Sequence, residues 1–174
     1  SKRSGKAVTL TDLLEDIGCD AARFFFNIRQ ANTHFDFDLD LAISNSNDNP
    51  VFYVQYAHAR ISSILRLLGE EGINTEENDF SALSALTDKA EIQLMEKIAE
   101  LPSEVSEAAA ALDPSKITKY AISLAADLHS FYNSNRVKSE DEKLMKARIM
   151  LIRAVKTTIK NSLKILGVSA PEKM

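Results

Sequence analysis

Residues 49–69 read NPVFYVQYAHARISSILRLLG, and this stretch decides the fold. Asn49 followed by Pro50 is a strong helix start, because proline at the first helical position gives up an N–H that would have no partner there. The apolar residues that follow keep the three-and-four spacing of one helix face: Val54, Ala57, Ile61, Leu65 and Leu68. Gly69 or Gly72 then supplies the end. The stretch predicts one long helix with a single buried face.

Similar start and stop signals recur along the rest of the chain. They predict helices at residues 11–18, 20–30, 87–102, 105–112, 113–133 and 139–167. Pro102 is expected to break the chain between two of these helices. The last helix opens with Ser139-Glu140-Asp141-Glu142, which has the form of a capping box. The predicted fold class is therefore all-α, a helical bundle.

One segment shows a different period. Residues 35–41, FDFDLDL, alternate apolar and acidic side chains, which predicts an extended, strand-like segment with one buried face. Its three aspartates would then face solvent. They also resemble the start of a calcium-binding loop, but that loop needs a glycine where Leu41 stands and a glutamate where Asn47 stands. We expect no calcium site, and His34, His58 and His129 are too far apart for a local metal motif.

Composition argues against a membrane role and reveals an uneven charge. The chain is 45% hydrophobic and 26% charged, and no apolar run approaches the ~20 residues that span a bilayer. The lone Cys19 has no internal partner, so we expect a reduced, cytoplasmic thiol, buried as a small hydrophobic side chain. The net charge is −4, but residues 114–174 hold twelve Lys and Arg against five Asp and Glu (+7), and the remainder holds nine against twenty (−11). This asymmetry indicates either a localised anionic partner or attraction between the two halves.

Two short segments carry groups suited to a ligand. Residues 55–60 place hydrogen-bonding and stacking groups along the middle of the long helix, and Tyr56 and Arg60 share a face because they are four apart. An aromatic residue in the core with an arginine at its rim would give the same spacing. Residues 1–6, SKRSGK, gather three cations around a glycine, which suits a phosphate and equally a disordered basic end. No nucleophile elbow or dinucleotide fingerprint is visible.

Several of these motifs resemble parts of one enzyme family. Residues 1–5 resemble the end of the Lys-Met-Ser-Lys-Ser loop of class I aminoacyl-tRNA synthetases, and Asp20-Ala21-Ala22-Arg23 resembles the Asp-Ala-Leu-Arg signature of one anticodon-binding domain family. Residues 35–41 and 49–60 are similar to the arginyl-tRNA synthetases in particular, as are Phe131-Tyr132-Asn133 and residues 166–174. The resemblance covers nearly the whole chain.

The resemblance implies a division of the chain and a set of site residues. Residues 1–45 would be the end of the catalytic region, and residues 46–174 the helical anticodon-binding domain. Lys2 would be catalytic, stabilising the ATP phosphates in the full-length enzyme. The residues implied to bind tRNA are Gln55, Tyr56, His58, Arg60, Tyr132, Asn133 and Met174. Lys173 departs from the family pattern, where an arginine would pair with phosphate in a bidentate manner.

The same resemblance implies a function and its partners. The chain would be the C-terminal, anticodon-binding part of an arginyl-tRNA synthetase, the ligase that uses ATP with magnesium to attach arginine to its tRNA. The fragment alone would be an inactive, cytoplasmic monomer that holds no metal or cofactor. Two alternatives stay open. One is a helical protein–protein interaction module with an exposed apolar groove, and the other is the anticodon domain of a different class I synthetase.

Overall fold

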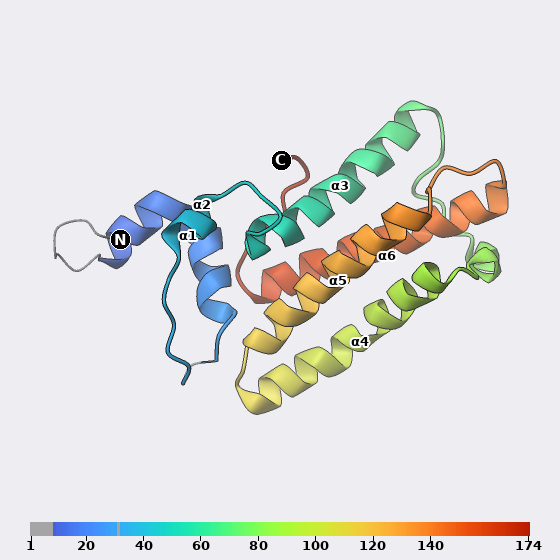
Figure 1. Ribbon diagram of the computed structural model, residues 1–174. Coiled ribbons are helices and arrows are strands. Elements are labelled where there is room, and N and C mark those ends of the chain that lie inside the picture. Colours follow the sequence, from blue (N-terminus) through green and yellow to red (C-terminus); the bar gives the residue numbers. More distant parts are fainter. Residues whose placement is uncertain (1–8, 31) are drawn as a thin grey trace.

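The computed structural model describes residues 9–30 and 32–174. Within that part of the chain it contains helices and no strand (Figure 1). The elements are α1 (Leu10–Asn27), α2 (Leu39–Ile43), α3 (Pro50–Glu70), the short 3₁₀ helix η1 (Phe80–Ala85), α4 (Lys89–Ala111), α5 (Ser115–Ser134) and α6 (Glu142–Ile165). The predicted all-α helical bundle is confirmed.

The four long helices pack around one hydrophobic core. α5 and α6 run side by side, with α3 and α4 packed against them, while α1 and α2 lie at one end of the bundle (Figure 1). The core includes these side chains, all without exposed surface: Phe24, Val54, Ile61, Leu94, Leu124, Phe131, Ile152 and Ile159. Because Phe24 comes from α1, that helix is joined to the bundle by the same core.

The long helix α3 begins and ends as its sequence predicts. Asn49 caps it, accepting a hydrogen bond from the Val51 N–H at 3.2 Å and donating to the carbonyls of Ala42 and Ser44 at 3.1 and 2.8 Å. The Asn49 side chain therefore fixes both the start of α3 and the path from α2. At the other end Gly72 adopts a positive φ of 84°, which glycine tolerates without steric cost.

The strand-like segment at residues 35–41 is not a strand. α2 begins at Leu39, and Asp38 caps it by accepting a hydrogen bond from the Leu41 N–H at 3.0 Å. The alternation itself is real, because Phe35 and Phe37 are partly buried against the core. The Phe37 ring lies 5.4 Å from that of Phe25, centroid to centroid. A period of two reports one-sided burial, but a strand also needs a neighbour for its backbone hydrogen bonds, and the described residues provide none.

Other sequence predictions were wrong in detail. α1 starts from a Thr9 cap and runs on past Gly18, whose φ of 79° and ψ of 163° nevertheless divide it into two helical pieces as expected. α4 is continuous through Pro102. Packing against α5 on both sides of that residue outweighs the roughly 3 kcal/mol that an interior proline costs. Cys19 is exposed rather than buried.

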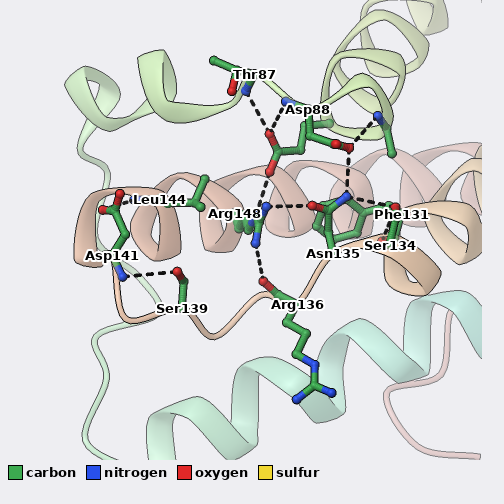
Figure 2. Close-up of polar contacts among 12 residues, drawn as sticks. Thr87, Asp88, Phe131, Ser134, Asn135, Arg136, Ser139, Asp141, Leu144 and Arg148 are labelled. Carbon is green, nitrogen blue, oxygen red and sulfur yellow. Dashed lines mark hydrogen bonds and ion pairs between the residues drawn. The ribbon is translucent and has the colours of Figure 1, made fainter.

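A buried ion pair joins three helices at the end of the bundle remote from α1 (Figure 2). The Glu91 side chain is 1% exposed, and the Nε of Arg148 on α6 donates to it at 2.7 Å. The backbone N–H groups of Thr87 and Asp88 also donate to Glu91, which completes the cap of α4. Arg148 further donates to the Asn135 side-chain oxygen at 2.7 Å, so α4, α5 and α6 are held by one network.

The chain after α6 folds back along α1 and α3, and we call residues 167–174 the tail. Polar contacts hold it to the bundle, including three from α3 and α6. The Gln55 Nε2 donates to the Ser169 carbonyl at 3.0 Å, the His58 Nδ1 lies 2.8 Å from the Pro171 carbonyl oxygen, and Lys156 pairs with Glu172 at 3.0 Å. The tail is therefore fixed without any secondary structure of its own.

His58 is buried in a way that resists protonation. Its side chain is 1% exposed, and burial lowers its pKa. A carbonyl oxygen can only accept, so Nδ1 carries the proton in its contact with Pro171. Nε2 is buried and has no partner within the described residues. A second proton on Nε2 would place a buried N–H without a hydrogen-bond acceptor among the described residues of the core.

Replacing Arg148 with alanine should lower the free energy of unfolding by about 3–5 kcal/mol, because the buried Glu91 carboxylate would lose its charged partner. Urea denaturation followed by circular dichroism measures this. The matched control is Arg66→Ala, which removes an arginine from an exposed pair with Glu70 and should cost about 0.5 kcal/mol or less. Equal losses in the two variants would contradict the prediction.

Acidification should destabilise the protein partly through His58. Because its pKa is lowered in the folded state, its contribution is fully present above the unfolded pKa of about 6.5 and is lost as the pH falls below that value. In His58→Asn the amide Nδ2 can still donate to the Pro171 carbonyl but does not titrate. Urea unfolding at pH 7.5 and 5.5 should therefore show a smaller loss of stability in the variant. An identical loss in both proteins would exclude His58 as the titrating group.

Candidate nucleic-acid interface

An open groove lies between the outer face of α3 and the end of the tail. Its volume is about 720 Å³. The residues that line it are Tyr56, Ala59, Arg60, Ser63, Arg66, Glu70, Lys173 and Met174. Three of these side chains are cations and one is an anion, so the lining favours a negatively charged ligand.

Arg60 is positioned by an aromatic ring from α5. Its guanidinium carbon lies 4.5 Å from the centroid of the Tyr132 ring. The Tyr132 hydroxyl is buried without a partner in the described part of the chain, and burial raises the pKa of this tyrosine. Arg60 makes no ion pair among the described residues. Tyr132 thus supports one face of the guanidinium, and the N–H edge is left to a ligand.

Tyr56 presents a pre-oriented ring at the edge of this groove. Its side chain is 37% exposed. The ring is nearly parallel to Phe52, with centroids 6.0 Å apart and an angle of 4°, and to His129 at 6.1 Å and 15°. An exposed aromatic ring held in this way can stack on an unpaired base at little entropic cost.

Gln55 and His58 lie elsewhere. Both side chains contact the tail rather than the groove lining, as described above. The four candidate residues predicted on this helix therefore lie on two different faces of it. Tyr56 and Arg60 face the groove, while Gln55 and His58 hold the chain that ends beside it.

Of the remaining predicted residues, Met174 lines the groove, Asn133 does not, and Lys2 lies outside the described part. Met174 is 56% exposed and lines both the groove and a second pocket of about 270 Å³ between α1, α2 and α3. Asn133 is exposed and follows Tyr132 on α5. Lys2 lies outside the described residues. Among the residues that are described, no group of His, Cys, Asp or Glu could hold a metal ion.

Sequence reasoning missed several groove residues. Ser63, Arg66 and Glu70 continue the face that Tyr56 and Arg60 begin, because they follow at helical spacing. Extending that face by about three turns from Arg60 would have found them. None of the described helices is long and apolar enough to cross a membrane.

Ion pairs between the two parts of the chain account for some of its charge asymmetry. Five cations of residues 114–174 pair with acids of the preceding part: Lys116 with Glu107, Lys138 with Glu71, Lys146 with Glu77, Arg148 with Glu91 and Arg153 with Glu76. Attraction between the two halves therefore accounts for part of the pattern. The cations of the groove come from α3 and the tail instead.

Comparison with known proteins identifies the family. Residues 54–174 match the family model described as the DALR anticodon binding domain. All 174 residues align with an arginine–tRNA ligase of Caldanaerobacter subterraneus subsp. tengcongensis at 55% identity and with one of Acetivibrio thermocellus at 51%, covering 31% of each. Thermus thermophilus arginyl-tRNA synthetase has a similar structure, with a TM-score of 0.77 and 29% identity over 91% of this chain and 27% of that one. The chain thus spans about a third of its curated relatives, and because the matched model covers most of it, the chain belongs to the DALR anticodon binding domain family.

Proposed function

We propose that this chain is the C-terminal anticodon-recognising part of an arginine–tRNA ligase and that its groove holds unpaired bases of the arginine tRNA anticodon loop. One observation carries this proposal: the groove is lined by both an exposed, oriented Tyr56 ring and an Arg60 guanidinium that has no internal acceptor in the described residues. Membership of the anticodon-binding family and similarity to arginine–tRNA ligases support it.

Each groove group suits a different part of a splayed RNA loop. Tyr56 offers a face on which one base stacks. The N–H edge of Arg60 can donate to a base edge or a phosphate, and Lys173 supplies a point charge for phosphate. Met174 presents an adaptable apolar side chain. The exposed Asn133 adds polar groups on α5, and Tyr132 contributes by supporting Arg60. Gln55 and His58 take part through the tail that they hold.

The whole ligase would use groups that lie outside this chain. We infer that residues 1–45 end its catalytic region and that residues 46–174 form the anticodon-binding domain. Lys2 would approach the ATP phosphates during attack by arginine, with magnesium supplied by the rest of the enzyme. We further infer a cytoplasmic protein in which this part acts as a monomer.

The groove argues against one of the two alternatives, and the similar proteins argue against the other. A protein–protein module needs an apolar groove for a partner helix, whereas this groove is lined by three cations and an exposed tyrosine. The anticodon domain of another class I synthetase would have relatives of that specificity at comparable identity, and the relatives given above are arginine–tRNA ligases.

The test is a binding titration at fixed salt concentration. The chain is titrated with an arginine-isoacceptor anticodon stem-loop and with a copy in which the anticodon bases are replaced. Base stacking and edge contacts should make the native loop bind about tenfold or more tightly than the copy. Equal weak binding would reduce the interaction to nonspecific electrostatics, and no binding of either RNA would favour the protein–protein module.

Arg60→Ala should weaken binding of the native stem-loop by about tenfold and reduce its preference over the altered copy. Loss of the unpaired guanidinium removes a ligand contact but no internal ion pair, so the melting temperature should change little. The matched control is Lys116→Ala, which removes a cation at the opposite end of α5 from Tyr132. A large drop in melting temperature with unchanged binding would show that Arg60 only covers the core.

A further inference from the structure

The tail is anchored by the same four-residue motif that suggested the family. Asp20 and Arg23 are the two polar residues of Asp20-Ala21-Ala22-Arg23 on α1. Both side chains contact the tail, about 145 residues later in the sequence. Ala21 and Ala22, between them, are buried and pack α1 onto the bundle. The two alanines thus fix α1 on the bundle, and the two charged residues contact the tail.

Asp20 accepts several hydrogen bonds at once. Its Oδ1 accepts from the Ser169 N–H at 3.1 Å. Its Oδ2 accepts from the Ser169 hydroxyl and from the Gln55 Nε2, the latter at 3.0 Å. Gln55 also donates to the Ser169 carbonyl, so Asp20 and Gln55 together satisfy the donor and acceptor groups of one tail residue. Hydrogen bonds to a carboxylate are about twice as strong as neutral ones.

Arg23 fixes the point at which the tail leaves α6. Its Nη1 donates to the Gly167 carbonyl at 3.2 Å. Gly167 has a φ of 69°, and a Cβ built on it would lie 2.1 Å from the Arg23 Nη1. No other residue type fits there while Arg23 stays in place. Arg23 and Gly167 are therefore closely packed where α1 contacts the start of the tail.

We propose that Asp20 and Arg23 are positioning residues for RNA recognition, which hold Gly167 to Ser169 so that Met174 lies beside Tyr56 in the groove. This inference rests on the proposed function. Neither residue lines the groove, although Asp20 lines the second pocket together with Met174. We expect both to act on the RNA through the tail. Gln55 and His58 on α3 also hold the tail, through the carbonyls of Ser169 and Pro171.

The first test follows Met174 without RNA. The chain has four methionines, so the ¹³C-methyl spectrum of labelled protein is simple, and Met174→Leu assigns the signal. Asp20→Ala should shift the Met174 methyl signal towards its position in an unfolded peptide. Glu15→Ala, which removes an exposed carboxylate from the same helix, should leave it in place. An unchanged Met174 signal in Asp20→Ala would overturn the proposal.

The second test uses RNA affinity in two backgrounds. Asp20→Ala should weaken native stem-loop binding about tenfold in the full chain. It should have no effect in a chain lacking residues 171–174, which keeps every partner of Asp20 but lacks the end of the tail. Equal weakening in both backgrounds, or unchanged affinity when residues 171–174 are removed, would overturn the proposal.

Two further arms separate folding and function. If Asp20→Ala does not fold, Ser169→Ala removes the hydroxyl partner from the exposed tail and should shift the Met174 signal in the same direction. If the unaltered chain does not prefer the native stem-loop, the proposed function fails. The methyl spectrum then still decides whether Asp20 positions Met174.

Discussion

The buried pairing of Glu91 with Arg148 is the interaction on which the arrangement of the bundle depends. It places a carboxylate from the start of α4 against a guanidinium from α6, and the guanidinium also donates to Asn135 in the loop that ends α5. Asn135, held by Arg148, follows Tyr132 by one helical turn. Tyr132, whose ring supports Arg60, therefore lies one turn before the residue that this network holds.

The helices could be predicted where local chemistry decides them. Asn49-Pro50 starts α3 because its cap and its fixed φ act over a few residues. Long-range contacts explain the failures. Pro102 lies inside α4 because packing on α5 outweighs its local cost. Arg148 falls in line with the apolar face of α6, yet its role appears only when Glu91, 57 residues earlier, is brought beside it.

Only part of the groove lining could be predicted from the sequence. Tyr56 and Arg60 were expected to share a face, and they do. Gln55 and His58 are close to them in sequence but turn towards the tail, because a helix rotates about 100° per residue and neighbours point in different directions. The tail has no periodic pattern, so sequence alone gives no sign of what would hold it. Only the structure brings residue 20 next to residue 169.

Cys19 gives this architecture a practical use. It is the only cysteine of the chain, it is exposed, and it immediately precedes Asp20 on α1. A thiol-reactive fluorophore would therefore attach at one site, beside the residue that holds Ser169. Its emission would follow movement of the tail in real time, with no cysteine to remove and none to introduce. The side chain that was expected to be buried and inert is in fact a ready attachment point for an optical reporter.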